Sequence, residues 1–453
     1  MTASASAIQR FQSGLSGPLL RPTDEGYEAA RRIWNAMIDK RPALIARCRI
    51  VSDVVNSVHF ARDHGLPMSV RGGGHNVAGN AVCDDGLMID LSLMRGIAVS
   101  AENRIASAEA GCTWGDFDRA TQAFGLATTG GVIPATGIAG LTLGGGLGWL
   151  MRKHGLSCDN LVSADLVLAD GRLVTASATE NTELFWGLRG GGGNFGIATA
   201  FQYRLHPIGA VFAGMVIHPL EQASKALKFL REFAQSTPDD LTLMAVFLTA
   251  PDGNKALALL GCFCGRNSEG EKVLAPLRQF GAPVADTFGT ISYVDFQALL
   301  EPGFPPGLQN YWKSNLLRDL NDDLIETFID AFRSVPSPTT AIAIEQLGGA
   351  VSRVPEDATA FNHRKNPFNA LIVSSWPDRA ENEKHIRWTR QLWQAIQPHS
   401  PGNVYVNYLG QEDDEGVDRV RAAYGAHKYE RLLALKQEYD PQNTFRMNQN
   451  IKP

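Results

Sequence analysis

The sequence predicts an α+β protein with more than one domain. Its 453 residues exceed what a single hydrophobic core usually holds. Candidate strands and helices follow one another in mixed order up to residue 205, as in an α+β domain. From residue 206 glycine becomes rarer and longer alternating strands and amphipathic helices take over, and the pattern changes again near residue 404. We therefore expect three parts, over residues 1–205, 206–403 and 404–453.

The composition is typical of a soluble globular protein, with 44% hydrophobic and 20% charged residues. A net charge of −5 gives no basic field, so neither nucleic acid nor an anionic membrane is an expected partner. Glycine interrupts the long apolar runs before the roughly 20 residues of a membrane span. Residues 1–17 are small and polar, which favours a cytoplasmic location. The six cysteines are too widely spread for a disulfide framework, and no Cys/His spacing is typical of a metal site.

In the first part, helical spacing of apolar residues and capping signals predict three helices, over residues 23–38, 51–65 and 113–123. Short strands with turn signals are predicted at residues 68–70, 86–91, 97–99 and 104–110. Asp170-Gly171 is a strong hairpin signal, here inside residues 165–175.

The middle part is expected to form an antiparallel sheet with helices on one side. Asp252-Gly253 predicts a hairpin between residues 241–247 and 256–263. Further strands are predicted at residues 341–347 and 369–376, and helices at residues 222–233 and 322–332. In the last part we expect a strand over residues 404–409 and a helix over residues 427–439.

Residues 71–76 (Arg-Gly-Gly-Gly-His-Asn) follow a predicted strand and are the most informative stretch. Three glycines allow positive φ and a close approach to a bulky ligand, and their N–H groups can form an anion-binding nest. Alone, the stretch is equally well a surface turn with an incidental His75. Further glycine clusters occur at residues 130–131, 144–148 and 190–196, however. Together they indicate several loops around one extended ligand, which we expect to carry a pyrophosphate and an electrophilic carbon.

Residues 191–196 formally match G-x-G-x-x-G, a dinucleotide-binding pattern. The preceding residues 183–189 have the pattern of a helix, whereas a dinucleotide-binding unit needs a strand there. A nicotinamide-dependent dehydrogenase therefore stays open as an alternative, and a colourless purified protein would favour it.

Motifs spread over nearly the whole chain resemble the FAD-linked oxidases of the vanillyl-alcohol oxidase/p-cresol methylhydroxylase superfamily, and within it the berberine-bridge-enzyme-like branch. They lie at residues 71–76, 137–148, 155–161, 185–196, 405–408 and 440–451. The resemblance implies a PCMH-type FAD-binding domain over residues 1–205 that residues 404–453 complete. It implies that residues 206–403 form a substrate-binding cap.

The resemblance also implies a covalent bond from His75 to the flavin 8α-methyl carbon. Many members have a second bond, from a Cys in a Cys-Pro-Thr-Val-Gly-like motif, but Ile133 occupies that position here. Cys158 is an unlikely substitute, because a small buried residue is its expected role. The singly linked type, such as the hydroxynicotine oxidases, is therefore the nearer analogue.

The activity implied is hydride transfer from a substrate C–H to flavin N5, with dioxygen or another acceptor taking the electrons. The base of the family corresponds to Tyr408, and Tyr405 is the second candidate. Because residues three apart on a regular strand point to opposite faces, we expect only one of the two to face the flavin unless a bulge intervenes. Alcohols, sugars and amines are all consistent with the family. A flavin-binding protein without turnover is a further alternative.

The residues expected to bind FAD are Arg71, Gly72, Gly73, Gly74, His75, Asn76, Gly79, Leu91, Pro134, Thr136, Gly137, Gly140, Leu141, Gly144, Gly145, Gly148, Trp149, Cys158, Asp159, Asn160, Ile197, Tyr408, Asn448 and Asn450. In the cap, the candidate substrate residues are Trp312, Lys313, Glu345, His363 and Arg364.

Overall fold

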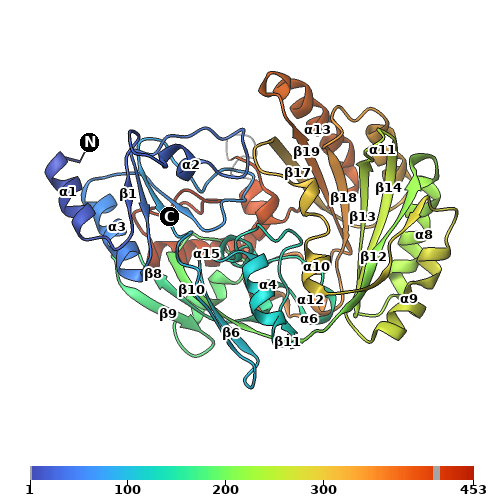
Figure 1. Cartoon of the computed structure of the whole chain (residues 1–453), viewed down its shortest axis with the longest axis horizontal. Coiled ribbons are helices and arrows are strands. Elements are labelled where there is room, and N and C mark those ends of the chain that lie inside the picture. Colours follow the sequence, from blue (N-terminus) through green and yellow to red (C-terminus); the bar gives the residue numbers. More distant parts are fainter. Residues whose placement is uncertain (1–2, 412–418) are drawn as a thin grey trace.

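The computed structural model describes residues 3–411 and 419–453 and divides them between two halves (Figure 1). Both ends of the chain lie in the half at the left of the figure, and the C-terminal helix α15 (Ala426–Tyr439) returns there. Among the described residues, no helix has the length and apolar character needed to cross a membrane.

Two small sheets form the left half. The first has the strand order β1-β2-β4-β3, with β2, β4 and β3 parallel and β1 antiparallel to β2. Its strands are β1 (Leu19–Leu20), β2 (Leu44–Arg47), β3 (Met68–Arg71) and β4 (Leu87–Asp90), and the helices of this region are α1 (Ala5–Ser13), α2 (Tyr27–Arg31) and α3 (Val51–Asp63). The glycine loop follows β3, the edge strand of this sheet.

The second sheet is antiparallel, with the order β5-β6-β10-β8-β9. Its strands are β5 (Ile97–Ser100), β6 (Ile105–Glu109), β8 (Leu161–Val167), β9 (Leu173–Ser177) and β10 (Ile197–Arg204). The helices of this region are α4 (Trp114–Gln122), α5 (Ile138–Leu143), α6 (Met151–His154) and α7 (Thr182–Leu188), and α6 lies next to α12 and β13. β7 (Leu126–Ala127) pairs with β11 (His206–Pro207). The predicted Asp170-Gly171 hairpin is confirmed as β8–β9.

The right half is one large antiparallel sheet, in the order β15-β12-β14-β13-β18-β19-β17 with β16 also beside β12. Its strands are β12 (Val211–Pro219), β13 (Leu241–Thr249), β14 (Lys255–Phe263), β15 (Ala285–Asp286), β16 (Gly289–Ile291), β17 (Gln309–Leu317), β18 (Ala341–Gln346) and β19 (Phe368–Trp376). The predicted hairpin of β13 and β14 and the predicted strands β18 and β19 are confirmed.

Four helices cover the outer face of this sheet (Figure 1): α8 (Ala223–Ser236), α9 (Asn267–Gln279), α11 (Asp322–Arg333) and α13 (Asn382–Ile396). Their apolar stripes pack on outward residues such as Phe247, Ile344 and Ile372. The inner face turns toward the left half, and the short helices α10 (Tyr293–Gln297) and α12 (Ala350–Arg353) lie between the halves. The predicted α+β class, with an antiparallel sheet covered by helices, is therefore confirmed, and we keep the boundaries at residues 205 and 403 as a proposal.

Two predicted elements are wrong. The helix expected over residues 23–38 is only α2, because Arg32 is extended and the following backbone donors bind other segments, Trp34 to Gly74 O and Ala36 to Leu308 O. The strand expected over residues 404–409 is a 3₁₀ turn, Val406–Tyr408. Its donors are used locally, since Tyr408 N–H donates to Tyr405 O.

Candidate functional site

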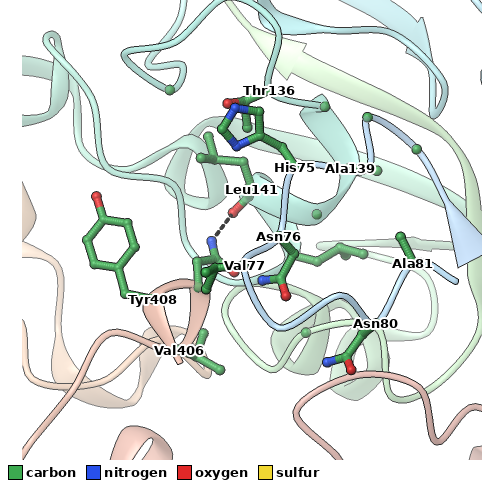
Figure 2. Close-up of a pocket in the computed structure, with 18 of the residues that line it drawn as sticks. His75, Asn76, Val77, Asn80, Ala81, Thr136, Ala139, Leu141, Val406 and Tyr408 are labelled. Atoms are coloured by element: carbon green, nitrogen blue, oxygen red, sulfur yellow. Dashed lines mark hydrogen bonds between the residues drawn. The ribbon is translucent and has the colours of Figure 1, made fainter. Parts of the chain in front are cut away.

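A deep cavity lies between the glycine loops of the left half and the inner face of the large sheet. The loop after β3, residues 131–141 and residues 192–198 supply one wall. Side chains from β13, β17, β18 and β19 supply the other. Residues 405–408 and 445–449 close it from the C-terminal part of the chain. Figure 2 shows Val406 and Tyr408 of the first segment.

Arg71 holds the start of the glycine loop. Its Nε lies 2.9 Å from Asp90 Oδ1 and its Nη2 2.5 Å from Asp90 Oδ2, across the register pair of β3 and β4. Its remaining Nη1 donates to Ala30 O at 2.6 Å. Since every nitrogen is used inside the protein, Arg71 supports the loop and does not line the cavity.

The glycines of the first wall fit a large ligand that lies against backbone. A Cβ on Gly73 would lie 2.3 Å from Gly137 N, so only glycine lets these two loops meet. Gly74 has φ +66°, in the region that favours glycine. At Gly140 and Gly193, both on the cavity, a Cβ would meet no atom within 4 Å. The loops thus leave an open cradle of bare backbone, which suits the extended FAD molecule.

His75 lies half-buried in this wall, with its Nε2 atom buried (Figure 2). Its ring stacks on the indole of Trp34, with centroids 4.4 Å apart and planes 15° apart. Its Nε2 has no hydrogen-bond partner among the described residues. Burial lowers the pKa of His75 to about 4. The imidazole is therefore neutral near pH 7 and keeps the lone pair that a nucleophile needs.

Trp34 and Asn35 form a strap that joins the glycine loop to the cap. Trp34 N–H donates to Gly74 O at 3.1 Å, and its indole Nε1 donates to Phe304 O at 3.1 Å. Asn35 Nδ2 donates to both Val77 O and Asn310 O at 2.9 Å. The strap therefore fixes the ring that lies against His75.

Tyr405 and Tyr408 both line the cavity, so the expectation that they face opposite sides is wrong. The 3₁₀ turn places their rings 4.9 Å apart, at 82°. Tyr405 Oη accepts hydrogen bonds from Gly146 N (2.8 Å) and Asn407 Nδ2 (2.7 Å). Tyr405 is thus tied to the glycine side of the cavity.

Tyr408 is tied to the cap side, where its hydroxyl donates to Glu345 Oε1 at 2.9 Å. Asn369 Nδ2 donates to the other oxygen, Oε2, at 2.7 Å, because β18 and β19 pair these two residues. Burial raises the pKa of Glu345. Burial, together with the charge of Glu345, raises the pKa of Tyr408 well above its usual value. Tyr408 is therefore a neutral phenol that can pass a proton to Glu345.

Thirteen of the residues expected to bind FAD line the cavity: Gly72, Gly73, Gly74, His75, Asn76, Leu91, Thr136, Gly137, Gly140, Leu141, Ile197, Tyr408 and Asn448. Those that do not are Arg71, Gly79, Pro134, Gly144, Gly145, Gly148, Trp149, Cys158, Asp159, Asn160 and Asn450. Several of the second group support the loops from behind. A Cβ on Gly148 would lie 1.8 Å from Gly130 O, and Asn160 Nδ2 donates to His154 O.

Cys158 is fully buried outside the cavity lining, and burial raises the pKa of its thiol. Ile133, at the position of the second linking cysteine, does line the cavity. Neither placement offers a thiolate to a flavin.

Of the five candidate substrate residues, Trp312 and Glu345 line the cavity. The other three lie elsewhere because they have structural partners. Lys313, next to Trp312 on β17, lies over the rings of Tyr311 and Trp393. His363 Nε2 lies 2.8 Å from Ala422 O, and Arg364 forms a buried ion pair with Asp159.

Sequence reasoning missed Trp34, Asn369 and Asn407. Trp34 was assigned to a helix that ends before it. Asn369 acquires its role only through its register with Glu345. Asn407 lies between the two tyrosines, and its side chain donates to Leu141 O and Tyr405 Oη. Its place inside a recognised motif was the one signal that could have identified it.

Comparisons with known proteins agree with this geometry. A family model described as "FAD binding domain" matches residues 42–177, and one described as "Berberine and berberine like" matches residues 404–452. An FAD-linked oxidoreductase from Dictyostelium discoideum is 32% identical and covers 98% of this chain and 97% of its own. The (R)-6-hydroxynicotine oxidase of Paenarthrobacter nicotinovorans is 33% identical, with 97% of each chain covered. The crystal structure of 6-hydroxy-D-nicotine oxidase from Arthrobacter nicotinovorans superposes with a TM-score of 0.90 at 30% identity, covering 97% of this chain and 98% of that one.

Proposed function

Because the chain belongs to the berberine-bridge-enzyme-like FAD-linked oxidoreductases, we propose that it oxidises a small molecule, with Tyr408 as the base and FAD attached through His75. The observation that carries the proposal is that one cavity has a bare glycine cradle with a neutral imidazole on one side and a Tyr–Glu pair on the other. FAD supplies the chemistry by accepting a hydride at its N5.

The proposed proton path uses residues that already touch. A phenol with a raised pKa does not become a phenolate near neutral pH, so Tyr408 needs an acceptor for its own proton. Glu345 Oε1 accepts its hydrogen bond at 2.9 Å. Tyr408 would take the substrate proton while passing its own to Glu345, whose raised pKa makes it a better base than an ordinary carboxylate.

The proposed covalent bond rests on the state of His75. Attack on the flavin methyl carbon needs a neutral imidazole, and burial keeps this ring neutral. We propose one bond only, because Cys158 is away from the cavity and position 133 is isoleucine.

The nicotinamide-dependent alternative has little support. Residues 191–196 connect helix α7 to β10, a strand of an antiparallel sheet, whereas a dinucleotide-binding loop connects a parallel strand to a helix. Gly192, Gly193 and Gly196 instead line the same cavity as His75.

The first test is an absorbance spectrum of the purified protein, followed by its intact mass after acid denaturation. We expect a yellow protein whose denatured mass exceeds the chain by one FAD, and a His75→Ala variant that releases its flavin on denaturation. A colourless protein at the bare chain mass under flavin-replete expression would contradict the proposal.

The second test concerns turnover, with dioxygen as the proposed acceptor and hydrogen peroxide as its product. Peroxide formation from an alcohol, amine or sugar panel would support an oxidase. A yellow protein that no donor reduces would favour a flavin-binding protein without turnover.

A further inference from the structure

The cap wall of the cavity is almost entirely apolar. Because strands alternate, one face of β13, β18 and β19 packs under the helices and the other face meets the cavity. The cavity face presents Met244, Val246, Trp312, Ala343, Leu371 and Val373. Glu345 is the one charged side chain on this wall among the described residues.

Glu345 has hydrogen bonds but no counter-charge. Its two oxygens accept from Tyr408 and Asn369, both neutral groups. Across residues 3–411 and 419–453, no Lys, Arg or His nitrogen forms an ion pair with it. Burying an ionised carboxylate is costly unless a cation accompanies it, so this arrangement suits a carboxylate whose partner arrives with the ligand.

We infer that the substrate is a small, largely apolar amine, which enters as an ammonium ion and pairs with Glu345. The inference rests on the proposed function and names the substrate class of the same cavity. The ring of Trp312, edge-on to Tyr408 at 6.1 Å, provides an aromatic wall that also favours a cation.

The same wall argues against the other substrate classes. Among the described residues of this wall, the polar side-chain groups are Trp312 Nε1 and the Glu345 carboxylate. A sugar would therefore bury most of its hydroxyls there without a partner, which is costly. An alcohol or phenol could donate to the Tyr408–Glu345 pair, but it would leave the buried charge without a partner.

In the oxidation step that we infer, Glu345 accepts the proton and FAD accepts the two electrons. The ammonium N–H proton passes through Tyr408 to Glu345, whose carboxylate becomes a carboxylic acid. The C–H bond on the carbon next to nitrogen then breaks, and its hydride forms a bond to N5 of FAD. The amine is oxidised by two electrons to an iminium ion, and FAD is reduced by the same two electrons.

The first measurement is calorimetric binding of an isosteric pair, benzyltrimethylammonium and neopentylbenzene, to the flavin-loaded protein. The two differ only in one charged nitrogen. We expect the wild type to prefer the cation by roughly tenfold or more, and Glu345→Gln to lose that preference. Asp118→Asn, which changes a buried acid outside the cavity lining, is the matched control and should keep it. Equal binding of the two compounds to the wild type would overturn the inference.

If Glu345→Gln does not fold, the pH dependence of binding to the wild type still tests the inference. The cation keeps its charge at every pH, so its advantage should disappear as acid protonates Glu345. Of the other ionisable groups on the cavity, Tyr405, Tyr408 and Tyr424 stay neutral over that range. His75, on the opposite wall, has a pKa of about 4, so the preference is followed above that pH. A preference that is independent of pH would count against Glu345 as its source.

The second measurement is anaerobic flavin bleaching by N-methylbenzylamine, benzyl alcohol and cellobiose. We expect the amine to bleach the flavin fastest, and the Glu345→Gln substitution to slow bleaching by the amine about 10²-fold or more. Faster bleaching by the alcohol or the sugar would overturn the amine class and leave the proposed oxidoreductase standing. A protein without flavin would instead refute the proposed function, while the binding pair would still test the cation site.

Discussion

The two walls of the cavity differ in what they are made of. The FAD side is largely backbone, with glycines such as Gly73, Gly137 and Gly140 that let loops meet each other and a ligand. The cap side is made of side chains that alternate strands present, with Glu345 among apolar neighbours. The difference matches the two proposed tasks: the first wall would hold the FAD, and the second would contact the substrate.

The largest expected effect comes from Gly73→Ala, a substitution on the FAD side of the cavity. The new Cβ would lie 2.3 Å from Gly137 N, and backbone cannot move aside cheaply. We expect little or no flavin in the purified variant, measured as the ratio of flavin to protein absorbance. Gly140→Ala is the matched comparison, since its Cβ meets no atom within 4 Å. Gly140→Ala should fold like the wild type but bind FAD more weakly. If purified Gly73→Ala still contains flavin, the loops of Gly73 and Gly137 need not touch for FAD to bind.

The next largest effect is expected from Tyr408→Phe, which changes the cap side of the cavity and should leave the flavin bound. We expect kcat to fall about 10²–10⁴-fold, because the proton path to Glu345 loses its first member. Tyr405→Phe is the comparison, since its hydroxyl faces Gly146 and Asn407. Normal turnover by Tyr408→Phe with an inactive Tyr405→Phe would reverse the assignment of the base.

The contrast between the walls also explains what the sequence could predict. The glycine loops and His75 lie in short continuous motifs, so a local pattern was enough to find them. The pairing of Glu345 with Asn369 depends on the register of β18 and β19, which no local pattern contains. Glu345 was therefore named only as one of five candidates, three of which lie away from the cavity.

The C-terminal part shows the same limit. Residues 404–409 are rich in valine and tyrosine, which fits a strand, but no strand of the described residues pairs with them and a 3₁₀ turn forms. That turn brings Tyr405 and Tyr408 to the same cavity. Trp34 was missed for a related reason, because its backbone bonds join Gly74 and Gly307, segments far from it in sequence.

A smaller effect is expected from Trp34→Ala, which loosens the FAD side without removing a glycine. The indole holds the His75 ring at 4.4 Å, and an aromatic stack of this kind contributes about 0.5–1.5 kcal/mol. We expect the fraction of chains with covalent flavin to fall about 2- to 10-fold, measured by intact mass. Trp34→Phe should restore most of it. An unchanged fraction in Trp34→Ala would show that the ring does not position His75.

The last effect is on stability and concerns the place where the two halves meet. Asp118 on α4 is buried, and its Oδ2 accepts from Gln297 Nε2 on α10, which also donates to Gly131 O. Burial raises the pKa of Asp118 to about 7. Between about pH 4 and 7, Asp118 therefore keeps its proton in the folded protein but has lost it in the unfolded chain, where its pKa is near 3.9. Stability contributed by Asp118 is full below that window and is lost as pH rises through it.

Asp118→Asn stays neutral at every pH, so it should exceed the wild type in unfolding free energy by about 1–3 kcal/mol at pH 8 and lose this advantage near pH 4. Asp116 on the same helix is the matched control with the opposite sign. Burial alone would raise its pKa, but hydrogen bonds from Thr113 and the charge of Arg95 outweigh burial and lower it. Asp116→Asn should therefore be less stable than the wild type at pH 8, with the deficit shrinking in acid. Denaturant unfolding of both variants at pH 8 and pH 4 measures these differences in unfolding free energy. If Asp118→Asn is more stable than the wild type by the same amount at both pH values, the junction between the halves carries no buried ionised group.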